Sequence, residues 1–250
     1  MTPLFPDNRS AAVSMTYDDA LNQHIDHAAV DLEKNGLRGT FFTPTVRGVV
    51  WASRRPEWAD VARRGHELGN HTRNHPCAKC HTFVKPEFAL ETYDLSRMEQ
   101  ELLQASQELA EVDGQPVRTY AYTCCEDFVG PERTSYRPLV ERLFPAARGI
   151  GTQLGDARRV DLSFVPSLSV VESLTLSELT GYVDRAIEAG GWAVFQFHGV
   201  GGGHRLNGSR ENHQALCEYI ASRKQDIYCG TFLDVAQQLR SGANRPWPAS

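Results

Sequence analysis

The stretch Met15-Thr16-Tyr17-Asp18-Asp19-Ala20 ends an apolar run in two adjacent carboxylates, and it sets the prediction for the whole chain. A second apolar run is followed by His71-Thr72-Arg73-Asn74-His75. Two histidines four residues apart fall on one side of a helical turn. A carboxylate brought to them by the fold would complete a two-histidine, one-carboxylate set that leaves coordination positions open. Together the two stretches predict a catalytic metal site.

The two adjacent aspartates are expected to serve different purposes, because successive side chains along a strand point to opposite faces. One can bind a metal ion while the other handles protons. Without a cation, two buried carboxylates side by side would repel, and at least one would tend to protonate. The competing interpretation is that Asp18 and Asp19 cap a helix starting at Ala20, and that His71 and His75 are ordinary surface or core histidines.

The fold class is predicted from alternation along the chain, where short β-branched or aromatic runs alternate with longer helical patterns. Predicted strands cover residues 11–17, 38–43, 67–70, 117–123, 147–151, 164–170, 192–198 and 226–232. Predicted helices cover residues 21–34, 56–64, 86–112, 131–144, 175–189, 212–223 and 233–240. Seven or eight such units indicate an α/β fold with a closed or nearly closed (β/α) barrel. We expect one domain over residues 1–240 and a loose tail at 241–250.

The residues that carry chemistry share one position in this pattern. Each lies at or just past the C-terminal end of a predicted strand, the face on which parallel barrels place their active sites. These residues are Asp18, Asp19, His71, His75, Cys124 and His198. This shared placement favours a functional site over helix capping or isolated core histidines.

Composition excludes several classes of function. The net charge is −5, and lysines and arginines are scattered, so we expect no nucleic-acid partner. The longest apolar run is about one strand long, which predicts no membrane helix. The first nine residues contain prolines and charges where a signal peptide needs an apolar core. We therefore expect a soluble cytoplasmic protein, and its six cysteines fit a reducing compartment. The sequence does not indicate which oligomeric state the protein has.

The cysteines allow more than one interpretation. The segment Cys77-Ala78-Lys79-Cys80-His81 matches a haem attachment pattern, and with His71 and His75 it would also suit a zinc knuckle. A closed four-ligand zinc site would leave no position for catalysis. A disulfide between Cys77 and the Cys124-Cys125 pair is a further alternative. Sequence alone leaves open whether these thiols are free, bonded or metal-bound.

The chain resembles a polysaccharide deacetylase, a carbohydrate esterase family four member with a NodB homology domain. The resemblance runs from Ala11 to about Leu239. The family's first motif, Thr-Phe-Asp-Asp-Gly, corresponds to residues 16–20, and its second, His-Ser/Thr-x-x-His, is matched by residues 71–75. An aromatic third motif is approximated by residues 120–125, and the last, an apolar strand ending in histidine, is residues 193–198.

The resemblance implies an irregular (β/α)7-8 barrel and a role for each matching residue. Asp18 is implied as general base, Asp19, His71 and His75 as metal ligands, His198 as general acid, and the backbone N–H of Cys124 as an oxyanion donor. Three departures stand out: Ala20 replaces a glycine, Thr123 replaces a proline, and Ala121 occupies the position of the arginine that often steadies the base.

Further residues are expected near the substrate. The stretch 199–203 lacks the lysine and serine of a phosphate-binding loop, so we expect a flexible lip that carries His204 to the substrate. Trp51 follows a predicted strand and could stack on a sugar ring, and Tyr122, near the end of another predicted strand, is a further candidate for substrate binding. The competing interpretation of both aromatic residues is packing in the core.

The sequence thus predicts a metal-dependent hydrolase acting on carbon–nitrogen bonds, which removes N-acetyl groups from amino-sugar oligo- or polysaccharides. It would use one divalent ion, most readily zinc, with cobalt, nickel or manganese as alternatives. A related alternative is an amidohydrolase that cleaves a small cyclic amide or ureide, as an allantoinase does. A third is an inactive carbohydrate-binding relative.

Overall fold

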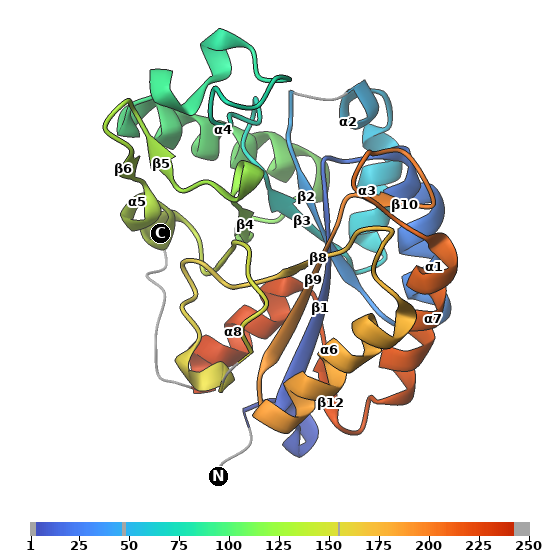
Figure 1. Cartoon of the computed structure of the whole chain (residues 1–250). Helices are drawn as coiled ribbons and strands as arrows, with labels where there is room; N and C mark the ends of the chain where they lie inside the picture. The colour runs from blue at the N-terminus through green and yellow to red at the C-terminus, as the bar shows by residue number, and fades with distance from the viewer. Residues whose placement is uncertain (1–3, 47–48, 155, 243–250) are drawn as a thin grey trace.

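The computed structural model describes residues 4–46, 49–154 and 156–242. Its centre is a curled sheet of parallel strands in the order β7-β4-β3-β2-β1-β9-β8, with β12 paired to β1 (Figure 1). The strands are β1 (Ala11–Asp18), β2 (Gly39–Thr43), β3 (Glu67–Asn70), β4 (Tyr120–Ala121), β7 (Ala147–Arg148), β8 (Leu168–Ser169), β9 (Trp192–Phe197) and β12 (Ile227–Cys229). The predicted (β/α) barrel class is confirmed.

The barrel is irregular because its strands differ in length and pairing. Strand β1 pairs with β9 along most of its length, with β12 near its start and with β2 near its end. The sheet curls round through the segment before β8, where Val165 forms a bridge with Arg148 of β7 while Leu168 pairs with Phe195 of β9. Strands β7 and β9 are thus linked through residues 165–169.

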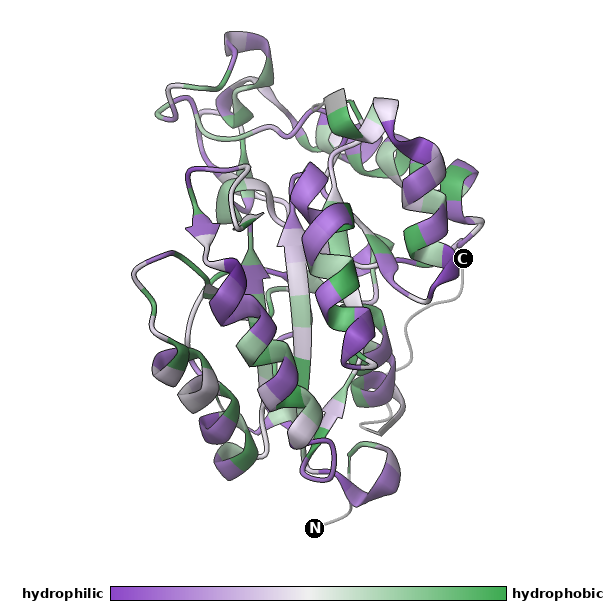
Figure 2. Ribbon diagram, turned by 90° about the vertical axis from the view of Figure 1, so that its right-hand side faces the viewer, coloured by the Kyte–Doolittle hydropathy of each residue, from purple (hydrophilic) through white to green (hydrophobic). Residues whose placement is uncertain are grey.

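Helices cover the outside of the sheet. In Figure 1, α1, α6 and α7 lie on one side of the strands, and α4, α5 and α8 lie on the other. Figure 2 shows these helices with a hydrophilic side and a hydrophobic side, as expected where one face packs on a sheet. The α-helices are α1 (Ala29–Lys34), α2 (Val49–Ser53), α3 (Arg55–Arg63), α4 (Leu95–Asp113), α5 (Arg137–Leu143), α6 (Leu176–Ala189), α7 (Arg210–Ser222) and α8 (Phe232–Gly242).

Local signals explain where these helices begin and end. Asp94 accepts a hydrogen bond from the N–H of Arg97 at the start of α4, and Gly114 ends that helix in the left-handed region at φ 70°. Thr175 and Glu178 form a capping box at the start of α6. Two predicted helices are more irregular than expected. The first is a π-helical turn, His24–Ala28, before α1, and the predicted 86–112 helix is two 3₁₀ turns followed by α4.

Four short strands form pairs outside the barrel. Phe128–Val129 (β5) and Thr134–Ser135 (β6) are antiparallel, whereas Gly199–Val200 (β10) pairs with Asn207–Gly208 (β11). The second pair holds the glycine-rich lip at both ends.

The end of the chain only partly tests the predicted tail. Helix α8 continues to Gly242, and residues 243–250 lie outside the described residues. The domain boundary at residue 240 therefore stays a prediction. Within the described ranges, no helix is both long and apolar enough to cross a membrane.

Candidate active site

The first site element is the turn that follows β1. Asp18 is the last residue of the strand, and Asp19 and Ala20 have φ angles of 79° and 50°. This left-handed turn directs the two carboxylates to different neighbours. Alanine pays about 1–2 kcal/mol for such a conformation, a cost that glycine avoids. Ala20, which stands where the family motif has glycine, therefore has a strained backbone conformation that this chain tolerates.

The second site element is the turn that follows β3. The prediction of a helical turn over residues 71–75 is wrong, because Thr72 and His75 have φ angles of 62° and 54°. Side chains close this turn instead: Asn70 Oδ1 accepts from the Thr72 N–H at 2.8 Å, and Thr72 Oγ1 accepts from the His75 N–H at 3.0 Å. The rings of His71 and His75 nevertheless lie 4.9 Å apart.

The two turns bring Asp19, His71 and His75 together. Asp19 Oδ1 lies 3.2 Å from Nε2 of His75 and 3.9 Å from Nε2 of His71. His71 Nδ1 donates to the carbonyl of Ala121 at 2.8 Å, which turns its Nε2 towards Asp19. Burial lowers the pKa of His71 to about 4, so its imidazole is neutral near pH 7. Two imidazoles and a carboxylate at this spacing fit a divalent ion, whose ligand atoms lie about 3.3 Å apart in a tetrahedral site.

Asp18 has hydrogen-bond partners of its own. Its Oδ2 accepts from Nη2 of Arg148 at 2.6 Å and from Nε2 of Gln196 at 2.9 Å. Burial acts to raise the pKa of Asp18, but the positive charge of Arg148, with smaller contributions from His71 and His198, lowers it below its usual range. Asp18 is therefore held ionised.

Arg148 and Gln196 were not predicted as site residues. In the third motif, Ala121 stands where the family often has an arginine that steadies the base. In this chain Arg148 of β7 contacts Asp18 instead. A charged residue inside a predicted buried strand was the one local signal that could have identified Arg148 as needing a partner. Arg148 is fully buried, and a buried guanidinium needs an anionic or polar partner.

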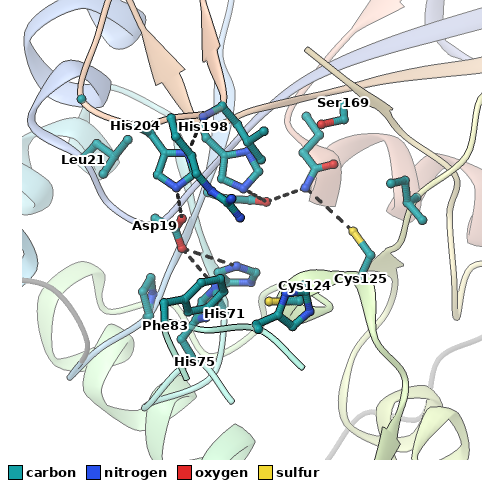
Figure 3. Close-up of a pocket in the computed structure, with 18 of the residues that line it drawn as sticks. Asp19, Leu21, His71, His75, Phe83, Cys124, Cys125, Ser169, His198 and His204 are labelled. Atoms are coloured by element: carbon teal, nitrogen blue, oxygen red, sulfur yellow. Dashed lines mark hydrogen bonds and ion pairs between the residues drawn. The ribbon is translucent and has the colours of Figure 1, made fainter. Parts of the chain in front are cut away.

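His198 follows β9 and lies beside Asp18. Its Nε2 is 3.9 Å from Asp18 Oδ2, and Nε2 of His24 donates to its carbonyl at 2.7 Å. Burial lowers the pKa of His198, although the charges of Asp18 and Asp19 oppose this. His204, on the lip between β10 and β11, stacks on His198 with ring centroids 4.7 Å apart. Figure 3 shows Asp19 between this histidine pair and the pair of His71 and His75.

Cys124 borders the same space and forms a disulfide with Cys77. The bond ties the third motif to the segment after His75, whose Nδ1 lies 3.5 Å from Cys77 Sγ. With Cys77 bonded to Cys124, the haem attachment and the zinc knuckle that would use Cys77 are both excluded. A disulfide is typical of oxidising compartments, so this bond weighs against the reducing compartment expected from the cysteine content.

These residues line one pocket of about 830 Å³ at the carboxyl ends of the strands. Its floor carries Asp18, Asp19, His71, His75, Cys124, Gln196 and His198, and its lip carries His204 and Arg205. Apolar side chains also line it, among them Leu21, Phe83, Ile150 and Leu206. A pocket of this size with a few convergent polar groups is typical of small-molecule and oligomer sites.

Two predicted substrate contacts require correction. Trp51 is fully buried against Trp58 in the core, with ring centroids 6.3 Å apart. Tyr122 is 1% exposed, and its hydroxyl donates to the carbonyl of Ser163. Neither residue lines the pocket, because both side chains point into hydrophobic clusters beneath the surface. Both are packing residues.

The family comparison agrees with the resemblance predicted from the motifs. Residues 6–126 match the family model described as polysaccharide deacetylase. The matched range includes both aspartates, both histidines of the second motif and Cys124. No curated protein matches the chain in sequence.

Solved structures share the fold at low sequence identity. A Mycobacterium smegmatis protein assigned as a polysaccharide deacetylase has a TM-score of 0.67 at 15% identity, covering 98% of this chain and 96% of that one. A peptidoglycan N-acetylglucosamine deacetylase in complex with a naphthyl N-hydroxybenzamide has a TM-score of 0.60 at 17% identity, covering 93% and 90%. A pseudoenzyme of family CE4 from Bacillus anthracis has a TM-score of 0.55 at 15% identity, covering 93% and 67%.

Proposed function

The chain belongs to the polysaccharide deacetylase family, and from this premise we propose that it is a divalent-metal-dependent hydrolase that removes N-acetyl groups from amino-sugar oligo- or polysaccharides. One observation carries the proposal. Asp19, His71 and His75 converge within one pocket that also holds Asp18 and His198. A pseudoenzyme shares this fold, so the fold alone does not imply activity, whereas these five side chains support it.

Asp19, His71 and His75 would hold the ion. When bound, a divalent ion supplies Lewis-acid activation of an acetamide carbonyl and of water. All three residues come from the turns after β1 and β3. They line the pocket that a substrate can enter.

Asp18 would act as the general base. Arg148 and Gln196 hold Asp18 Oδ2 and keep the carboxylate ionised, so it is ready to take a proton from the attacking water. Its other oxygen, Oδ1, has no hydrogen-bond partner among the residues described. We assign Oδ1 as the oxygen that receives the proton.

His198 would act as the general acid that delivers a proton to the departing amine. Its Nε2 lies 3.9 Å from Asp18 Oδ2, the oxygen that Arg148 also contacts, and its ring stacks on His204, which lines the same pocket. Burial lowers its pKa, so the protonated form is a stronger acid than a free imidazolium. Cys124 lines the same pocket, and its backbone N–H would donate to the carbonyl oxygen as charge develops there.

The experiment is a substrate panel. The metal-loaded protein is incubated with N-acetylglucosamine oligosaccharides and, in parallel, with small cyclic ureides, and released acetate and ring opening are measured. The proposal predicts acetate release that a chelator abolishes and added zinc or cobalt restores. Ureide cleavage without acetate release would overturn the substrate class. Oligosaccharide binding without turnover would identify an inactive relative.

A further inference from the structure

We propose that a second divalent metal ion, of the zinc type, binds at the rim of the pocket between Cys80, His81 and Glu126. One ligand atom from each side chain lies within 4.8 Å of the others. None of these three residues belongs to the group of Asp19, His71 and His75. The proposal therefore does not depend on the proposed function.

The two carboxylate oxygens of Glu126 have different neighbours. Its Oε2 accepts a hydrogen bond from the backbone N–H of Ala78 at 2.6 Å, which fixes the side chain. Its Oε1 then lies 3.6 Å from Nε2 of His81, too far for a hydrogen bond. Two atoms that face each other at this distance have the spacing of ligands on one ion, about 3.3 Å in a tetrahedral zinc site.

The segments that carry the ligands are already held together. Cys80 and His81 follow Cys77 by three and four residues, Glu126 follows Cys124 by two, and the Cys77–Cys124 disulfide joins the two segments. The His81 ring also stacks on Phe83, with centroids 5.4 Å apart. Because these contacts do not involve an ion, little conformational freedom is left to lose when one binds.

The donor types select the kind of ion. A thiolate, an imidazole and a carboxylate suit zinc and similar transition metals, whereas magnesium and calcium prefer oxygen ligands only. Cys80 is exposed, so an ion can enter from solvent and keep a fourth position for water. Since His81 and Phe83 also line the pocket, this ion would stand beside the substrate entrance.

The neighbouring group of His75, Cys77 and Cys124 does not compete for this role. Its three ligand atoms are equally close, but the two sulfur atoms are bonded to each other. A thiolate is the sulfur ligand that binds metal, and a disulfide has none. With the disulfide intact, Cys80 is the one free thiol among the residues of the three candidate metal-binding groups.

Cobalt(II) tests the proposal, because only a thiolate ligand gives a sulfur-to-cobalt charge-transfer absorption. The full-length, metal-free protein is titrated with Co²⁺ without thiol reductant, so that the disulfide stays closed. The proposal predicts this absorption in the wild type and in His71→Ala. Cys80→Ser should lose the absorption and about one bound ion per chain. Cys229→Ser, which removes a half-buried thiol elsewhere, is the matched control and should retain both.

Two outcomes would overturn the rim site: a fully loaded wild type without the charge-transfer absorption, or an absorption that survives Cys80→Ser. Equal melting temperatures of metal-free Cys80→Ser and metal-free wild type would show that the variant folds. The proposed function fails on a different result, the absence of chelator-sensitive turnover. The two failures are therefore distinguishable.

Discussion

Two buried carboxylates at opposite ends of the barrel strands have opposite surroundings. Glu67, the first residue of β3, accepts four hydrogen bonds from neutral donors: the N–H and hydroxyl of Thr119, the hydroxyl of Thr40 and the N–H of Leu233. Burial raises the pKa of Glu67, and these hydrogen bonds oppose the rise only in part. The amino ends of the strands are therefore closed by a satisfied polar cluster.

Asp18, the last residue of β1, is held on one oxygen only. Among the residues that the structure describes, Asp18 Oδ1, Gln196 Oε1 and His198 Nδ1 are buried without a hydrogen-bond partner. A buried polar atom left unpaired costs about 1–3 kcal/mol. Glu67 is built for stability, whereas the surroundings of Asp18 leave groups free for a ligand. The difference supports the proposal that the active site lies at the carboxyl ends of the strands.

The largest effect should come from Asp18→Asn. The amide keeps the shape and can still contact Arg148, but it cannot take a proton from water. We expect kcat to fall about 10²- to 10⁴-fold while metal content stays at the wild-type level. Steady-state kinetics with metal analysis check this. Glu67→Gln is the matched control and should leave kcat unchanged in the folded protein. A near-normal rate for Asp18→Asn would remove Asp18 as the base.

A smaller but more diagnostic effect is expected from Arg148→Met. Without the guanidinium, burial raises the pKa of Asp18, so the base is protonated over a wider acidic range. The acid limb of the kcat/KM profile should move to higher pH, with a loss of at least about 10-fold at neutral pH.

The control for Arg148→Met is Arg142→Met, which removes an exposed ion pair with Glu99 and should not move the profile. If both variants keep the wild-type profile, Arg148 does not set the ionisation of Asp18.

The smallest effect on catalysis, and a clear one on stability, is expected from Glu67→Gln. The substitution replaces one accepting oxygen with an NH₂ group, which would then face the hydrogen-bond donors around residue 67. This should lower the free energy of unfolding by about 1–3 kcal/mol. The direction in which stability changes with pH follows from the raised pKa. Because the folded pKa lies above its ordinary value of 4.5, the native state holds more protons than the unfolded state, and ionisation destabilises it as pH rises through that window.

Denaturant unfolding across pH 4 to 8 tests the Glu67 prediction. The wild type should lose the Glu67 contribution to its stability as pH rises from the ordinary pKa through the raised one, and Glu67→Gln should show a flatter dependence. An unchanged slope would mean that Glu67 does not titrate with folding.

The sequence was sufficient to predict the class of fold and the residues of the motifs. Short apolar or aromatic runs between longer helical patterns identified the barrel strands, because a strand buried on both faces reads as a continuous apolar run. Asp18, Asp19, His71, His75 and His198 do meet in one pocket. Their roles stay proposals, but their proximity follows from strand ends that share one edge of a parallel sheet.

What the sequence did not reveal depends on contacts between distant segments. Arg148 reaches Asp18 across 130 residues because β4 pairs with both β3 and β7, a register that no local pattern encodes. The Cys77–Cys124 bond spans 47 residues in the same way. Trp51 was assigned wrongly for a different reason: it follows a predicted strand, but its side chain is fully buried in the core and does not line the pocket.

The central claim is that Asp19, His71 and His75 bind one ion, and anomalous diffraction from zinc-loaded crystals tests it most directly. The account predicts an anomalous peak at about 2.0–2.2 Å from the Asp19 carboxylate and from Nε2 of both histidines. His71→Ala crystals should lose this peak. Zinc-loaded wild-type crystals with no peak between these three side chains would contradict the account.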